Sequence, residues 1–187
     1  MKTATFSVVL FSLVGITLAQ NIPYFFTKSP ELLCRQDIYS GDIFSDSKAI
    51  ANFVRTQTNE KDKILVFGSE PQILFYARRP SAVGYIYTYP LMENQPFALK
   101  MQKEYSKKVQ EVLPKFIIYI TATGSWTRGP QSYTHIFEWS TGFMEKYYKQ
   151  VGLAEIYYDK TLYYWGEDAD GRPAATPDAV MIMQMKY

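Results

Sequence analysis

The chain begins with an apolar stretch, residues 4–19 (ATFSVVLFSLVGITLA), that contains no charged side chain. Its length lies close to the lower limit for a membrane-spanning helix, which needs ~20 mostly apolar residues and at least about 17. Apolar and aromatic side chains continue to Phe26, so we assign residues 1–26 to one hydrophobic N-terminal segment. Two interpretations fit this pattern: a retained transmembrane anchor, and a signal peptide cleaved after Ala19.

Both interpretations of residues 1–26 send the rest of the chain to the same side of a membrane. Lys2 is the only charged residue before the apolar stretch, and positive charge stays on the cytoplasmic side. The remaining chain is therefore expected on the extracytoplasmic, periplasmic side. It would be membrane-anchored there if the segment is retained, and secreted if the segment is cleaved.

Residues 27–44 lack a regular hydrophobic pattern and contain Pro30 and Gly41, which predicts an irregular linker. From residue 45 to residue 187 the pattern predicts one domain, in which apolar side chains either repeat at helical spacing or form short continuous runs. Continuous runs are typical of strands that are covered on both faces of a sheet. We predict helices at 45–59, 71–79, 93–113 and 136–151, with Gly152 as the last C-cap, and strands at 63–68, 85–89, 115–120 and 153–158.

The alternation of strands with helices predicts an α/β fold with helices on both faces of the sheet. Because crossover connections are right-handed, we expect a three-layer, doubly wound, mostly parallel sheet, preceded by the hydrophobic N-terminal helix. Residues 161–165 and 180–187 are predicted to form a C-terminal hairpin around the long polar loop 166–178.

Composition and charge narrow the function classes. Hydrophobic residues make up 47% of the chain and charged residues 20%, as in an ordinary folded domain. The formal net charge is +2. The mild excess of lysines at 100, 103, 107 and 108 is interleaved with Glu104 and Glu111, which favours a solvated helix face, so no basic face for nucleic acid is expected. Cys34 and His135 are the only residues of their kinds, and no ligand spacing predicts a metal site.

Cofactor and nucleophile motifs are absent from the sequence. The turn Gly68–Pro71 contains one glycine, where a dinucleotide fingerprint needs three, so no cofactor is predicted. The pattern G-x-S-x-G does not occur either. A triad of Ser125, His135 and an aspartate is conceivable, but a surface or capping role is the favoured interpretation of His135, and we assign no catalytic residue. Residues 167–171 are interpreted as an acidic surface turn because they lack the full ligand set of a calcium loop.

Four residues are candidate binding residues. Glu70 follows the first predicted strand, where doubly wound sheets bind ligands, and a stand-alone enzyme would have a pocket with perturbed titratable groups near it. Arg78 and Arg79 could hold an anionic group, although solvated positive charge at a helix C-terminus is the favoured interpretation of both. Trp126 could stack on a sugar ring, although packing is the commoner role of such a residue.

Residues 39–92 contain Tyr39 and Phe44, Val66-Phe67-Gly68-Ser69-Glu70-Pro71 and Tyr87-Thr88-Tyr89-Pro90, and further along the chain come Pro114-Lys115-Phe116-Ile117-Ile118 and Ser125-Trp126. In these pieces the chain resembles the C-terminal soluble domain of membrane glycosyltransferases related to the dolichyl-phosphate-mannose protein mannosyltransferases and the bacterial lipid A aminoarabinose transferases. The likeness extends over about residues 20–187, and its motifs are structural.

In this family many transmembrane helices hold a polyprenyl-phosphate sugar, and an acidic residue in the first extracytoplasmic loop acts as the base. The soluble domain follows the last helix, to which residues 4–19 would correspond. The acidic loop is not part of this sequence, so the resemblance supplies no catalytic residue. It implies an accessory or acceptor-positioning domain that is not catalytic alone. Its partners would be the membrane, the membrane part of a glycosyltransferase, and a glycan or polyprenyl-phosphate sugar.

Two other functions remain open at the level of the sequence. A secreted glycan-binding module would use the aromatic surface, since 17% of the residues are aromatic, and would be favoured by cleavage after Ala19. A small stand-alone α/β enzyme would have its pocket near Glu70.

Overall fold

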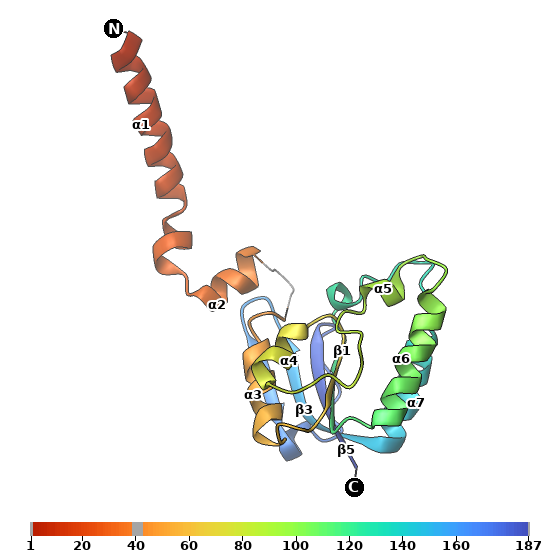
Figure 1. The fold of residues 1–187 in the computed structure, drawn as a ribbon. Coiled ribbons are helices and arrows are strands. Elements are labelled where there is room, and N and C mark those ends of the chain that lie inside the picture. The colour runs from red at the N-terminus through yellow and green to blue at the C-terminus, as the bar shows by residue number, and fades with distance from the viewer. Residues whose placement is uncertain (1, 39–42, 187) are drawn as a thin grey trace.

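Figure 1 shows a long N-terminal helix, a short linker, and a domain in which helices pack on both faces of one sheet. The computed structural model of the chain describes residues 2–38 and 43–186. Tyr39 and Gly41, which belong to the predicted linker, and Tyr187, the end of the predicted hairpin, lie outside the described residues. The predicted α/β class is confirmed.

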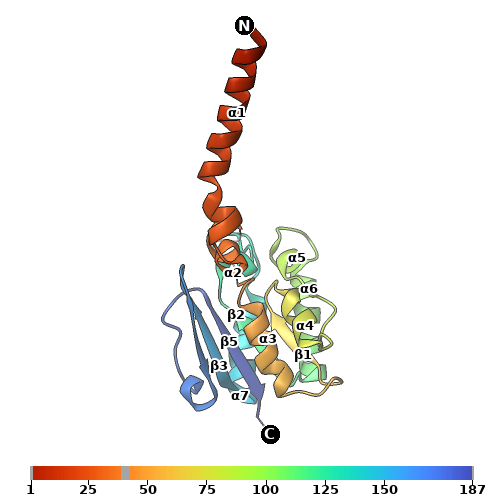
Figure 2. The ribbon, with the colours of Figure 1, turned by 90° about the vertical axis from the view of Figure 1, so that its left-hand side faces the viewer.

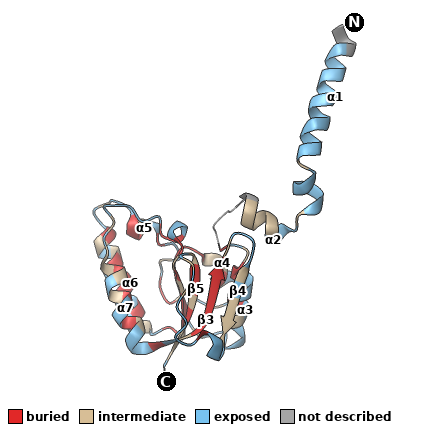
Figure 3. Ribbon diagram, turned by 180° about the vertical axis from the view of Figure 1, so that it is seen from behind, coloured by how far each residue is buried: buried red, intermediate tan, exposed pale blue. Residues whose placement is uncertain are grey.

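The N-terminal segment forms α1 (Lys2–Gln20), which points away from the domain in Figure 1 and in Figure 2. Its large apolar side chains from Phe6 onward are exposed, and Figure 3 shows the helix in pale blue except at its grey N-terminal end. Within the described part of the chain, no helix combines the length and the apolar character required to cross a membrane.

Short helices occupy much of the segment that the sequence predicts to be irregular. The π-helical turn η1 (Pro23–Thr27) follows α1, and α2 (Pro30–Leu33) and η2 (Cys34–Ile38) come next. Ser29 starts α2, because its side chain accepts a hydrogen bond from a backbone N–H in the first turn of that helix. Ile43 is already buried in the core of the domain.

The domain is built on one five-stranded sheet with the strand order β1-β2-β5-β3-β4. Only β1 and β2 run parallel, and the other neighbouring strands are antiparallel. The prediction of a mostly parallel, doubly wound sheet is therefore wrong, although the prediction of helices on both faces is confirmed. The strands are β1 (Ile64–Phe67), β2 (Phe116–Ile120), β3 (Tyr148–Ile156), β4 (Thr161–Trp165) and β5 (Ala179–Met185).

The length of each connection explains the direction of the strands. The chain between β1 and β2 contains helices and is long enough for the crossover that a parallel pair needs. The chain between β3 and β4 is only the turn 157–160, in which the Tyr157 N–H donates to the Lys160 carbonyl at 2.8 Å. Such a tight turn can join only antiparallel strands.

The predicted C-terminal hairpin does not form, because β3 lies between β4 and β5. β4 pairs with one edge of β3, and β5 pairs with the other edge and also with β2. Burial accounts for this order. Val180 and Ile182 of β5 are fully buried in the middle of the sheet, whereas β4 is partly exposed along its length and suits an edge.

Residues 85–89 do not form the predicted strand. Ser81, further upstream, makes the isolated bridge with Ile64, and α5 (Tyr89–Met92) begins at the last residue of the predicted strand. Pro90 explains the difference, because it lacks the N–H that a strand would pair and its fixed φ suits the first turn of a helix.

The last helix of the domain is also shorter than predicted. α7 (His135–Tyr147) ends where β3 begins, so Gly152 lies inside a strand and caps no helix. Tyr148 marks the change, since its buried hydroxyl donates to the Pro114 carbonyl at 2.8 Å. Gly152 instead leaves room for the Trp165 ring, which would lie 2.9 Å from a Cβ at this position.

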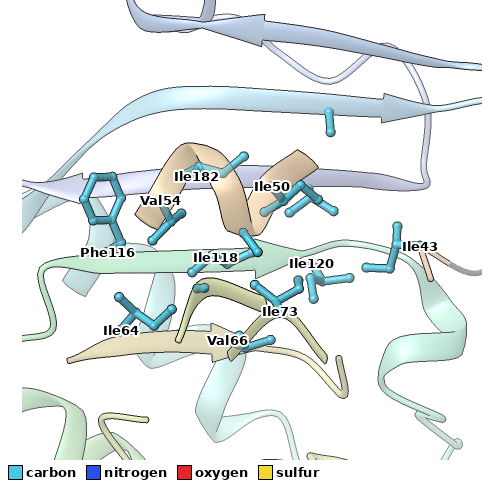
Figure 4. Packing of buried hydrophobic residues seen from close by; sticks show 14 of the residues in the cluster. Ile43, Ile50, Val54, Ile64, Val66, Ile73, Phe116, Ile118, Ile120 and Ile182 are labelled. Atoms are coloured by element: carbon cyan, nitrogen blue, oxygen red, sulfur yellow. The ribbon is translucent and has the colours of Figure 1, made fainter. Parts of the chain in front are cut away.

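Two helices cover each face of the sheet. α3 (Ser47–Thr56) and α4 (Pro71–Ala77) lie on one face, and α6 (Ala98–Val112) and α7 lie on the other. The side chains of β1 alternate between the two cores, and Figure 4 shows Ile64 and Val66 in the core beneath α3 and α4. Because both faces are buried, this strand is a continuous apolar run, as predicted.

Candidate functional site

Glu70 lies where the sequence analysis located a candidate site, at the carboxyl end of β1 and the start of α4. Its side chain is 4% exposed, and one carboxylate oxygen accepts a hydrogen bond from the Ser125 hydroxyl at 2.7 Å. Ser125 Oγ in turn accepts from the backbone N–H of Ser69 at 2.9 Å. The turn after β1 is therefore joined to the loop after β2 by buried hydrogen bonds.

Thr88 brings a third loop into this arrangement. Its N–H donates to Ser69 Oγ at 3.0 Å, and its hydroxyl donates to the Ser125 carbonyl at 3.2 Å. The hydroxyls of Ser69 and Thr88 lie 2.9 Å apart. We call Ser69, Glu70, Thr88 and Ser125 the loop-junction network, because it connects the three loops at the carboxyl ends of the parallel strands.

Gly68 makes the close packing of the loop-junction network possible. A Cβ at this position would lie 2.5 Å from Ser125 Oγ, 2.6 Å from a carboxylate oxygen of Glu70 and 2.7 Å from Ile120 Cδ1. These distances are far shorter than van der Waals contacts, so only glycine leaves the space that the polar side chains occupy.

The geometry of the network fits the positioning of loops better than turnover of a substrate. Ser125 Oγ is already both a donor to Glu70 and an acceptor from a backbone N–H, and these groups are buried. His135, the conceivable base of a triad, lies 3.3 Å from the Ser106 hydroxyl on α6 instead. Among the described residues, which include the acidic turn 167–171, no group of side chains is placed to hold a metal ion.

Trp126 is part of the core. Its side chain is 4% exposed, and its indole N–H donates to the Ile120 carbonyl at 2.8 Å. The ring packs against Phe67 and Phe137, with centroids 4.8 and 4.7 Å away. Of the two roles considered from the sequence, packing is the one that the structure displays.

Arg79 binds backbone atoms of its own domain. Its Nε donates to the Thr58 hydroxyl at 2.8 Å, and its terminal nitrogens donate to the carbonyls of Thr58 at 2.7 Å and Arg55 at 3.1 Å, and also to those of Ala77 and Arg78. Several of these carbonyls belong to the ends of α3 and α4, where positive charge is favourable. The guanidinium is thus fully used in joining two helix C-termini.

Arg78 differs from its neighbour although both are cationic. Its backbone ends α4 in the left-handed region, at φ 54°, and its side chain is exposed. No hydrogen bond or ion pair of its guanidinium is recorded with the part of the chain that the structure describes. Arg78 and Arg79 line one surface groove, which does not include Glu70 or Trp126. The structure therefore separates the four candidate binding residues into three locations.

The clearest pKa shifts among the described residues belong to tyrosines that are buried or partly buried. Burial raises the pKa of Tyr105, whose hydroxyl lies under β1, and that of Tyr148 at the start of β3. Burial also raises the pKa of Tyr163, and its hydrogen bond to Asp46 adds to this effect. These hydroxyls stabilise the core as neutral donors.

Comparison with known proteins gives no match: no protein family model, curated protein or solved structure matches this chain. The resemblance to membrane glycosyltransferases therefore rests on the residues quoted for it. Three of those pieces, 66–71, 87–90 and 125–126, are far apart in the sequence and meet in the loop-junction network.

Proposed function

We propose that this chain is the extracytoplasmic accessory domain of a membrane glycosyltransferase that uses a lipid-linked sugar. In this proposal the domain is not catalytic alone, and it positions the acceptor or covers the membrane site. The family resemblance supplies the reaction class, and it gains support because its separate motifs form one contiguous structural unit, the loop-junction network.

The observation that carries the membrane part of the proposal is the exposure of α1. Its apolar side chains are solvent-exposed around the helix, with exposed fractions of 69% for Phe6, 73% for Phe11 and 59% for Leu13. A helix that is apolar on all sides requires an apolar environment. The apolar region just below a bilayer surface, or the helices of a membrane partner, would provide one without requiring α1 to cross the membrane alone.

The arrangement of the linker is consistent with a role next to the membrane. α2 and α5 lie at the same end of the domain in Figures 1 and 2. α5 follows directly after Thr88 of the loop-junction network. The loops at the carboxyl ends of β1 and β2 are therefore on the side from which α1 extends, where they could meet the membrane part of a transferase.

The first test is flotation of the purified full chain with phospholipid vesicles. We expect the chain to float with the vesicles, and we expect the double variant Leu10→Glu/Val14→Glu to remain unbound because each glutamate is costly in the bilayer. Lys107→Glu makes the same change in net charge on the exposed face of α6 and is the matched control. Equal flotation of all three proteins would contradict the proposal.

The second test addresses the reaction. In membranes of the source cells, in-frame deletion of the coding region for residues 45–187 is expected to abolish sugar transfer from a labelled polyprenyl-phosphate sugar. Unchanged transfer would refute the accessory role. Recovery of the chain as a soluble extracytoplasmic protein beginning at Gln20 would instead support the secreted glycan-binding module.

A further inference from the structure

A groove of about 800 Å³ runs along the exposed side of α4, between the end of α3 and the loop that contains Ile86. It lies apart from the loop-junction network, and the proposed glycosyltransferase role does not use it. Its lining contains three arginines and no acidic residue, together with prolines and large apolar side chains. The three arginines are Arg55, Arg78 and Arg79.

Two of these arginines have donors left for a ligand. Arg79 is occupied by backbone carbonyls and the Thr58 hydroxyl, so it contributes charge but no free donor. Arg55 donates through one terminal nitrogen to Asn52. The Arg78 guanidinium has no recorded partner within the described residues. The groove therefore combines a positive potential with unsatisfied planar donors, a combination that suits phosphate and carboxylate groups.

The backbone at Arg78 strengthens the argument for a binding role. A helix ends in the left-handed conformation at lowest cost with glycine, because any other side chain adds steric strain there. An arginine at this position stabilises the fold less than glycine would. Among the described residues, its guanidinium has no hydrogen bond or ion pair that would offset this strain, and Arg78 lies at the groove.

The apolar part of the groove restricts the ligand further. Phe75 is 76% exposed, and its ring packs edge-on against Tyr76 with centroids 5.4 Å apart. Exposed aromatic rings beside hydrogen-bonding cations suit a sugar ring that carries an anionic group. We infer that this groove is a binding site for an anionic sugar, held by Arg55 and Arg78 on its charged group and by Phe75 on its ring.

Titration of the full chain in mild detergent, followed by backbone NMR shifts, tests this site with four matched probes. Glucose 6-phosphate and glucuronate carry the two types of charged group, glucose carries none, and inorganic phosphate lacks the sugar. We expect saturable shifts around the groove with the two anionic sugars, weaker binding of phosphate and none of glucose. Binding should weaken as salt is raised, because the arginines are exposed to solvent.

Variants distinguish binding from folding. Arg78→Gly is expected to weaken binding of glucose 6-phosphate by ~10-fold or more, because a bidentate charged contact is lost. The same change should raise the midpoint of thermal unfolding by about 2 °C, because the strain at φ 54° is relieved. Leu113→Gly is the matched control, since Leu113 ends α6 at φ 49° outside this groove. It should bind glucose 6-phosphate like the parent.

Phe75→Ala distinguishes the contribution of the sugar ring to binding from that of the charged group. We expect it to weaken binding of both anionic sugars about threefold and to leave binding of inorganic phosphate unchanged. Binding of glucose as tight as that of glucose 6-phosphate would overturn the inference, as would parent-like binding by Arg78→Gly. Loss of vesicle flotation by the α1 variant would have no bearing on these results, so the two proposals fail independently.

Discussion

The guanidinium of Arg35 lies 2.8 Å from a carboxylate oxygen of Asp46, and only 12% and 1% of these two side chains are exposed. The same oxygen accepts a hydrogen bond from the Tyr163 hydroxyl, and Arg35 also donates to Thr161 Oγ1 at 2.7 Å. This ion pair fastens the segment after α1 to the start of α3 and to β4. It fixes the position at which the N-terminal segment enters the domain.

Removal of the charge on Asp46 is therefore expected to destabilise the domain. Asp46→Asn keeps the size of the side chain but leaves Arg35 nearly buried without a counter-charge, which should lower the free energy of unfolding by about 3 kcal/mol. Urea denaturation measures the loss. Glu111→Gln is the control, because it breaks the 3.1 Å ion pair between Glu111 and Lys108, two side chains that are each about half exposed. It should change the free energy of unfolding by less than ~0.5 kcal/mol. Equal losses of stability for the two substitutions would contradict the view that burial makes the Arg35–Asp46 pair the more important one.

The adjacent arginines at the end of α4 should differ strongly in how much their truncation destabilises the domain. Arg79→Ala leaves the carbonyls of Arg55 and Thr58 without their donor and is expected to lower the free energy of unfolding by ~2 kcal/mol. Arg78→Ala removes a side chain with no recorded partner and should stay within about 0.5 kcal/mol of the parent. Thermal or urea unfolding of the two variants decides this, and a larger loss for Arg78→Ala would show that the roles are reversed.

The hydrophobic pattern of a single segment is enough to predict some elements of this fold. β1 and β2 are buried on both faces, and continuous apolar runs located them correctly. The amphipathic helix α6 was located by its spacing, although it begins at Ala98 and not at residue 93. In these cases the side chains that become buried also form the hydrophobic pattern of the segment, so the sequence is sufficient to locate the element.

Pairing between distant strands was not predictable in the same way. Nothing local to residues 161–165 or 180–187 shows that β5 inserts between β2 and β3, because this depends on which edges need covering. The candidate site could be predicted from the sequence only in part, for the same reason. Glu70 was identified from its place after a strand, but Ser69, Thr88 and Ser125 become a network only when three loops meet. The buried Arg35–Asp46 pair was missed because both residues resemble ordinary surface charges in the sequence.

The surroundings of Asp62 make the stability of the domain depend on pH. The Asn59 N–H donates to its carboxylate at 2.7 Å, and this bond and the nearby Lys115 lower the pKa of Asp62 below the ordinary value of 3.8. A lowered pKa means that the folded state favours the charged carboxylate. The resulting stability is present above about pH 4 and is lost as the pH falls through the lowered pKa of the folded state.

Asp62→Asn should therefore be less stable than the parent at pH 7, by ~1 kcal/mol, and equal to it at pH well below the lowered pKa. Urea unfolding of both proteins over the acid range measures the difference. Asp159→Asn, in the turn between β3 and β4, is the control and should follow the parent throughout. A difference that grows as the pH falls would have the wrong sign and would rule out this account.

Substitution of Gly68 tests whether the loop-junction network needs a residue without a side chain at this position. Gly68→Ala places a methyl group 2.5 Å from Ser125 Oγ and 2.6 Å from a Glu70 oxygen, so the network must open, at a cost of about 2 kcal/mol in the free energy of unfolding. Gly124→Ala, in the neighbouring loop, meets nothing within 4 Å and should stay within ~0.5 kcal/mol of the parent.

A second substitution identifies the clash at Gly68 as the cause. Ser125→Ala removes the nearest atom to the new methyl group, so the Gly68→Ala/Ser125→Ala double variant should be less destabilised than the sum of the single variants. Urea denaturation of the parent and the three variants gives the interaction energy. If the two losses simply add, Ser125 Oγ is not what the methyl group meets, and the glycine must serve another purpose in the turn after β1.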